Sequence, residues 1–196
     1  MAEIERQVLI KDQCEKDLLW DFYDGIFQPI NQQTPFVQSF PKKDFLRWLD
    51  DPNVVKFSAK DKGRIVGLGI VTEEIDLEPL LSPAYFRKHY PDAHFLYCPV
   101  VAVAPTHKGK GVAIDLIRLM LCEGKDNTAL LFLHSKAMSL GVPRLFSLSG
   151  AGRIEGKEID AEACWLFRWK GGKKMWPEDL IKLRVLPADG LSSRRD

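Results

Sequence analysis

The sequence has almost no excess charge and no long hydrophobic run. Its 28 Lys and Arg stand against 27 Asp and Glu, which gives a formal net charge of +1 at pH 7. Dedicated nucleic-acid binders and polybasic membrane-surface proteins usually carry a clear basic excess. No apolar run approaches the roughly 20 residues that a membrane-spanning helix needs. We therefore expect neither a nucleic-acid nor a membrane partner, although the basic segment 168–184 keeps a nucleic-acid module as an alternative.

The sequence also has few cysteines, and its first residues lack the apolar region typical of a signal peptide. Its four cysteines lie far apart and form no Cys-x-x-Cys pair; they are Cys14, Cys98, Cys122 and Cys164. This spacing disfavours both a disulfide framework and a zinc site, so we expect reduced thiols and no metal. Residues 1–6 are charged and no signal-type apolar region follows them. These features predict a cytoplasmic protein.

What the sequence does contain is enough apolar material for one core. Hydrophobic residues make up 45% of the 196 positions, and neither a repeat nor a low-complexity tract is visible. We expect a single domain over 1–186 and a disordered tail at 187–196. Within the domain, the proline- and aromatic-rich stretch 76–93 reads as an insertion that forms a substrate lid.

Apolar periodicity predicts alternating strands and helices. Strands are expected at 8–10, 54–60, 65–72, 95–104, 144–149 and 165–169, and helices at 17–26, 42–50, 111–123, 128–140 and 177–183. Pro29 is expected to end the first helix, and the 111–123 helix is apolar enough to be largely buried. Gly67 and Gly69 lie inside a strand, which favours close packing or a bulge over a phosphate loop, and Pro99 marks a strand irregularity. The order predicts a mixed α/β fold with a mixed sheet.

The most informative stretch is 100–113, VVAVAPTHKGKGVA, in which a buried strand leads through a proline turn and a basic loop into a helix. Gly109 and Gly111 allow positive φ and a close backbone approach. The first turn of the helix presents unpaired N–H groups and the positive end of its dipole. His107, Lys108 and Lys110 add positive charge. Such a loop is suited to a pyrophosphate, although its spacing fits neither a Walker A loop nor a dinucleotide fingerprint.

This stretch resembles the acyl-CoA-binding motif of the Gcn5-related N-acetyltransferase (GNAT) superfamily, Arg/Gln-x-x-Gly-x-Gly/Ala. Lys108 takes the Arg/Gln position, Gly111 the central glycine and Ala113 the final small residue. The element order over about residues 8–150 is similar as well. The resemblance implies a mostly antiparallel sheet with a splayed parallel strand pair, flanked by helices. It also implies acetyl-CoA as cosubstrate and a primary amine, on a small molecule or a peptide, as acceptor.

The resemblance assigns cofactor-binding roles along the motif. Backbone groups of Val101 and Val103, on either side of Ala102, would pair with the pantetheine amides. The pyrophosphate would be held by the backbone amides of Lys108, Gly109, Lys110, Gly111, Val112 and Ala113. The strand that carries Val101 would splay from the strand at 144–149. Dimers are common in the family, so the resemblance also admits a homodimer.

Candidate catalytic residues are harder to assign. Acetyl transfer needs a neutral amine, and family members often place a carboxylate base where Tyr97 lies here. Tyr97 would instead orient a substrate or water, or simply pack in the core. Glu73 and Glu74 end the neighbouring strand in an acidic loop that is equally typical of a solvated surface, and His94 is a further candidate.

The general acid that the family often supplies is missing, because no tyrosine follows Tyr97. Ser149 and Cys164 are the nearest replacements. This absence keeps open a second hypothesis, a non-catalytic acyl-CoA-binding or regulatory protein with the same fold.

Overall fold

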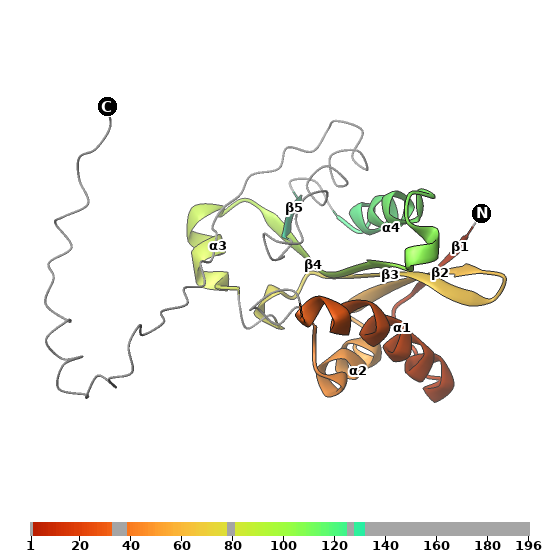
Figure 1. Ribbon diagram of the computed structural model, residues 1–196. Helices are drawn as coiled ribbons and strands as arrows, with labels where there is room; N and C mark the ends of the chain where they lie inside the picture. Colours follow the sequence, from red (N-terminus) through yellow and green to blue (C-terminus); the bar gives the residue numbers. More distant parts are fainter. Residues whose placement is uncertain (1, 33–38, 78–80, 125–127, 132–196) are drawn as a thin grey trace, which may run out of the picture. The chain divides into compact units, whose positions relative to one another are not determined.

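The computed structural model describes residues 2–32, 39–77, 81–124 and 128–131, all of which belong to one compact unit, Met1–Ala161. A five-stranded sheet has the order β1-β2-β3-β4-β5 (Figure 1). Its strands are β1 (Glu3–Gln7), β2 (Val54–Asp61), β3 (Arg64–Thr72), β4 (His94–Val103) and β5 (Thr128–Leu131). The first four pair antiparallel and β5 runs parallel to β4. The predicted mixed α/β class is therefore confirmed.

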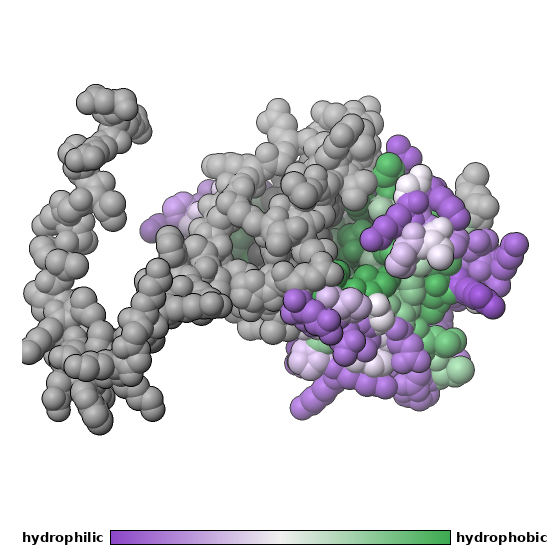
Figure 2. All heavy atoms as spheres, in the orientation of Figure 1, coloured by the Kyte–Doolittle hydropathy of each residue, from purple (hydrophilic) through white to green (hydrophobic). Residues whose placement is uncertain are grey.

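Helices cover both faces of the sheet. They are α1 (Gln13–Asn31), α2 (Lys42–Asp50), α3 (Pro83–His89) and α4 (Val112–Leu121), with short 3₁₀ turns η1 (Ile75–Leu77) and η2 (Pro105–His107). In Figure 1, α4 lies on one side of β2, β3 and β4, and α1 and α2 lie on the other. Among the described residues, no helix is long and apolar enough to cross a membrane. In Figure 2, polar side chains cover most of the coloured surface, and apolar ones appear mainly between α4 and the α1–α2 layer.

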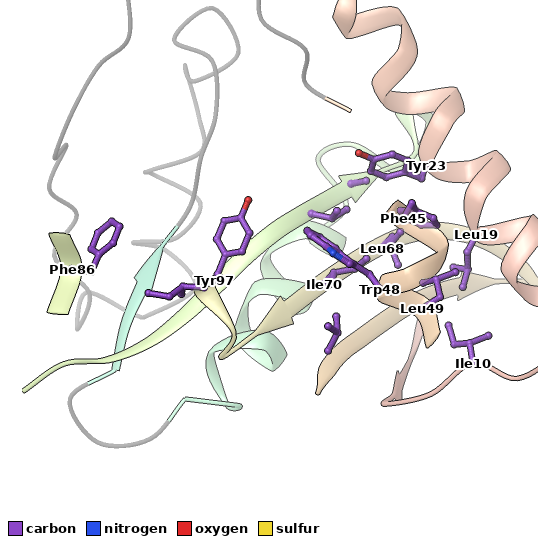
Figure 3. Packing of buried hydrophobic residues seen from close by; sticks show 14 residues of the cluster. Ile10, Leu19, Tyr23, Phe45, Trp48, Leu49, Leu68, Ile70, Phe86 and Tyr97 are labelled. Carbon is purple, nitrogen blue, oxygen red and sulfur yellow. The ribbon is translucent and has the colours of Figure 1, made fainter. Parts of the chain in front are cut away.

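Two apolar clusters, one on each face, hold these layers together. Under α1 and α2 the cluster includes Tyr23, Phe45 and Ile70, each fully buried (Figure 3). Tyr23 also accepts a hydrogen bond from the backbone N–H of Phe40 at 2.7 Å, and burial raises the pKa of its hydroxyl. Under α4 the cluster joins Leu116, Met120 and their neighbours to the opposite face of the sheet.

β4 contains a bulge at Pro99, as its sequence predicts. The register pairs Ile70 with Val100 but Thr72 with Tyr97, so β4 carries one extra residue between these two pairs. As a result Tyr97 and Val100 both join the core under α1 and α2, although a regular strand would place them on opposite faces. The bulge therefore separates the half of β4 that leads into the basic loop from the half that begins at His94.

The glycines of β3 are explained by α4. A Cβ atom at Gly67 would lie 2.9 Å from Val112 Cγ1, and one at Gly69 would lie 2.5 Å from Met120 Sδ. Both distances are shorter than the contacts that Cβ atoms make in folded proteins. Helix α4 can therefore pack this closely on β3 only because these two positions lack side chains. The expectation of close packing is confirmed.

Residues 128–131 correct one prediction. They form β5, paired in parallel with His94–Tyr97, and do not begin a helix. A short apolar run has no periodicity that distinguishes a strand from a helix, so the open edge of β4 decides its conformation. The remainder of the predicted helix, the strands at 144–149 and 165–169, the last helix, the domain end at 186 and the tail 187–196 lie outside the described residues.

Three other boundaries differ from expectation. The first strand is Glu3–Gln7, which pairs with β2, whereas Val8 and Leu9 after it are exposed. Helix α1 continues past the exposed Pro29 to Asn31, because one missing N–H does not outweigh the packing of the helix on the sheet. Helix α4 ends at Leu121, before the predicted end at 123. The helix is also less buried than predicted, because Leu119 on its outer side is 39% exposed.

Candidate functional site: a glycine loop at the start of helix α4

The glycine loop, residues 105–111, connects β4 to α4. The backbone N–H of Ala104 still donates to Val66 O of β3 at 2.9 Å, which fixes the point where the chain leaves the sheet. Gly109 and Gly111 then adopt φ values of +76° and +86°, and Gly111 is the N-cap of α4. Residues other than glycine rarely adopt such φ values, so the path of the loop depends on both glycines.

The loop directs backbone N–H groups and positive charge to one place. The first helical hydrogen bond runs from Asp115 N to Gly111 O at 3.0 Å, so the amides of the first turn have no acceptor within the helix. The Lys108 and Lys110 side chains are exposed beside this turn. Together with the positive end of the helix dipole, these groups form an arrangement suited to a phosphate or pyrophosphate.

His107 does not contribute to this arrangement as expected. Its Nε2 lies 3.1 Å from Asp61 Oδ2, at the end of β2, and its Nδ1 lies 3.0 Å from Thr106 Oγ1. With the proton on Nε2, the ring donates to Asp61 and accepts from the Thr106 hydroxyl. This hydrogen bond lowers the pKa of the Asp61 carboxyl group. His107 thus fastens the loop to the β2–β3 hairpin. Sequence patterns gave no signal for this contact because the two residues are far apart along the chain.

One acidic residue lies close to the start of α4. Asp115 Oδ2 is 3.9 Å from the place that a Cβ atom at Gly111 would occupy, and Asp115 Oδ1 is 3.6 Å from Arg118 Nη1. Both side chains of this pair are about half exposed. The carboxylate interacts favourably with the positive end of the helix dipole, but it would repel an anion bound at the first turn.

The second half of β4 carries the three residues predicted to hold pantetheine. Val101 pairs with Gly69 and Val103 with Gly67, and both valines are half-buried, whereas Ala102 points into the core. In the described part of the chain, β5 pairs only with the first half of β4, up to Tyr97. Cys98, at the bulge between the halves, is fully buried, and burial raises the pKa of its thiol. It is therefore inert as a nucleophile.

Glu73 and His94 meet at the other end of β4. Glu73 Oε1 lies 3.0 Å from His94 Nε2, although the two atoms lack the alignment of a hydrogen bond. They line an open cavity of about 250 Å³ with Asp76, Arg87 and Tyr90 among its walls, and Arg87 forms an ion pair with Asp76 at 3.0 Å. The fold thus brings together two candidate residues from different parts of the sequence.

Glu74 points to a different place. Its Oε1 accepts a hydrogen bond from Asn53 Nδ2 at 2.8 Å, and it lines a second open cavity of about 260 Å³ near Glu123. Glu73 borders both cavities. The two glutamates therefore share the second cavity, and only Glu73 also reaches the first.

Tyr97 lies within the core. It is 2% exposed and belongs to the apolar cluster under α1 and α2. Figure 3 shows its ring rising from β4 with the hydroxyl at the end away from the strand. No three His, Cys, Asp or Glu side chains of the described residues gather as metal ligands.

Comparisons with known proteins identify the fold. A predicted acetyltransferase with acetyl-CoA from Clostridium acetobutylicum is 16% identical, covers 84% of this chain and 96% of its own, and gives a TM-score of 0.55. The chain has the GNAT fold. The GNAT-like fold expected from the sequence is thereby confirmed.

Two further structures are similar to this GNAT-fold chain. An aminoglycoside acetyltransferase from an uncultured soil metagenomic sample, in complex with sisomicin, is 15% identical over 85% of this chain and 97% of its own, with a TM-score of 0.51. A transcriptional regulator from Bacillus halodurans C-125 is 14% identical over 82% of this chain and 99% of its own, with a TM-score of 0.52. No family model matches the sequence, and no curated protein does.

Proposed function

We propose that the chain is an acetyl-CoA-dependent N-acetyltransferase that transfers an acetyl group to a primary amine of a small molecule or peptide. The observation that carries this proposal is the glycine loop, where two positive-φ glycines place the start of α4 directly after β4. A GNAT fold with this loop at the end of β4 supports acyl-CoA as the ligand.

Each part of the cofactor has a proposed place along β4 and α4. The amides of the first turn of α4 bind the pyrophosphate, with Lys108 and Lys110 adding charge. Backbone groups of Val101 and Val103 pair with the pantetheine amides, as a further strand would. The thioester then lies near the bulge at Pro99, and the acceptor amine approaches from the Tyr97 side.

Transfer requires the amine to be neutral. Its nitrogen attacks the thioester carbonyl carbon, the C–N bond forms, the C–S bond breaks, and the sulfur of CoA leaves with a proton from the nitrogen. The Glu73–His94 pair is the proposed acceptor of the ammonium proton that must leave first. It lies at the start of β4, beyond the bulge from the loop, so the proton would reach it through water. Tyr97, which is buried, orients groups rather than acting as a base.

The alternative is a protein of the same fold that binds acyl-CoA without turnover. It is favoured by the burial of Tyr97, by the engagement of Glu74 with Asn53, and by the lack of any tyrosine after Tyr97. The two functions share the cofactor site and differ in whether the thioester is cleaved.

Calorimetry with CoA tests the shared site. Lys108→Glu places a carboxylate beside the proposed pyrophosphate, and we expect binding to weaken by roughly tenfold or more. Lys43→Glu is the matched control, because Lys43 is exposed on α2 and should leave affinity unchanged. Equal affinity of the wild-type protein and Lys108→Glu would contradict the placement of the site.

Release of free thiol from acetyl-CoA separates the two functions. The acceptor panel contains polyamines, amino acids, aminoglycosides and peptides; aminoglycosides are included because a protein of similar fold acts on them. Thiol release that depends on an acceptor supports the transferase. Tight binding of acetyl-CoA without release on any acceptor supports the binding protein instead.

A further inference from the structure

The β2–β3 hairpin has a tight turn that fixes which of its side chains share a face. Lys62 and Gly63 form the turn with φ values of +49° and +76°, the pattern of a type I′ turn. Asp61 and Arg64 flank the turn as directly paired residues. Directly paired residues on neighbouring strands project from the same face of a sheet, so Arg64 shares the face of Asp61.

That face lies against the glycine loop. Asp61 Oδ2 is 3.1 Å from His107 Nε2, and the His107 side chain is only 15% exposed. The contact joins the hairpin to the loop immediately before Lys108. Arg64, as the cross-strand neighbour of Asp61, is therefore brought beside the place where the loop would hold a pyrophosphate.

The charges at this junction are unbalanced. The one acidic group of the turn, Asp61, is occupied by His107. Lys62 and Arg64 of the hairpin are exposed, as are Lys108 and Lys110 of the loop. None of these four cations forms an ion pair within the part of the chain that the structure describes. The hairpin and the loop, which the Asp61–His107 contact joins, thus each carry two exposed cations.

We propose that Arg64, supported by Lys62, binds the 3′-phosphate of CoA, so that the hairpin forms a second wall of the cofactor site. This inference rests on the proposed function. In CoA a ribose ring links the pyrophosphate to a phosphomonoester at its 3′ carbon, so a ligand whose pyrophosphate lies on the loop carries a second anionic group nearby. A guanidinium binds the oxygens of such a group in a bidentate manner. The exposed position of Arg64 fits this role better than a structural one.

Calorimetry with CoA and with dephospho-CoA, which lacks only the 3′-phosphate, tests the assignment. We expect the wild-type protein to bind CoA about tenfold more tightly, which is the effect of one charge-assisted contact. Arg64→Gln should weaken CoA binding by a similar factor and leave dephospho-CoA binding unchanged. Arg64→Lys should restore part of the loss.

Arg47→Gln is the matched control, since Arg47 is an exposed arginine on α2 and should change neither affinity. If the wild-type protein binds both ligands equally, or if Arg64→Gln weakens both alike, the assignment of Arg64 is wrong while the cofactor site stands. If the wild-type protein binds neither ligand, the proposed function itself fails, and the inference fails with it.

Discussion

Among the residues of the site, Asp115 is expected to oppose ligand binding. Its carboxylate lies near Gly111, where the pyrophosphate is proposed to bind, and Arg118 neutralises it only in part. We predict that Asp115→Asn binds CoA about two- to fivefold more tightly, because a repulsion between partly exposed charges is removed. Calorimetry at low and high salt checks this, since the gain should shrink as salt screens the charges.

Asp21→Asn on the exposed side of α1 serves as the control. A carboxylate in the first turn also stabilises the helix, so Asp115→Asn should lower stability slightly while it raises affinity. A variant that binds CoA more weakly than the wild-type protein would place the anion elsewhere.

Lys56 is a second residue with an unusual environment. It is fully buried, and its Nζ donates to Val8 O at 2.9 Å and Asp51 O at 2.7 Å. Burial lowers the pKa of the Lys56 amine to about 8, although the nearby Asp51 carboxylate acts in the opposite direction. The amine thereby links the end of β1 to the turn that precedes β2.

This pKa predicts a pH dependence of stability. Between about pH 8 and pH 10.5 the unfolded chain keeps a proton that folded Lys56 has lost, so the free energy of unfolding should rise with pH in that window. We predict that the wild-type protein gains stability relative to Lys56→Met by on the order of 1 kcal/mol per pH unit there. Urea unfolding of both proteins at pH 7, 8, 9 and 10 measures the difference, and parallel pH profiles would refute it.

At the scale of elements, the packing of α4 on β3 controls both stability and the position of the loop. Gly67→Ala would push a methyl group against Val112 and Leu116, at the start of α4, and also against Ala59. Gly69→Ala meets the flexible end of Met120 instead. We predict that both variants lose stability, by about 1–3 kcal/mol for an overpacked core, and that Gly67→Ala loses more. Urea unfolding tests this order.

Ligand affinity distinguishes the two variants further. Only Gly67→Ala displaces the first turn of α4, so only it should also weaken CoA binding. Gly25→Ala in α1 is the control, because a Cβ atom there meets nothing within 4 Å, and alanine is expected to stabilise a helix relative to glycine. Equal losses of stability and no change in affinity would mean that α4 adapts without moving the loop.

At the scale of the whole molecule, the sheet sets the distance between the two ends of the site. β4 carries the glycine loop after its last residue, Val103, and the Glu73–His94 pair beside its first, His94. The bulge at Pro99 lies between them. Under the proposed function, the acceptor would reach the thioester from the His94 end of the strand, because the Glu73–His94 pair and the glycine loop lie at opposite ends of β4.

Much of the fold followed from local sequence patterns. The helix at 42–50 has the bounds that its apolar face and Pro41 indicate, and the hairpin turn at Lys62 and Gly63 follows from its residues. The β5 strand could not be predicted in this way, because a four-residue apolar segment takes its conformation from the strand beside it.

By itself the sequence determined the glycine loop, since glycine at positions 109 and 111 is what permits the positive φ values that place α4. It also determined the bulge at Pro99, because proline cannot donate to a strand ladder. Only the tertiary structure decided that His107 is bound to Asp61 and that Glu73 lies beside His94. These contacts depend on strand register and hairpin twist, which join residues that no local pattern relates.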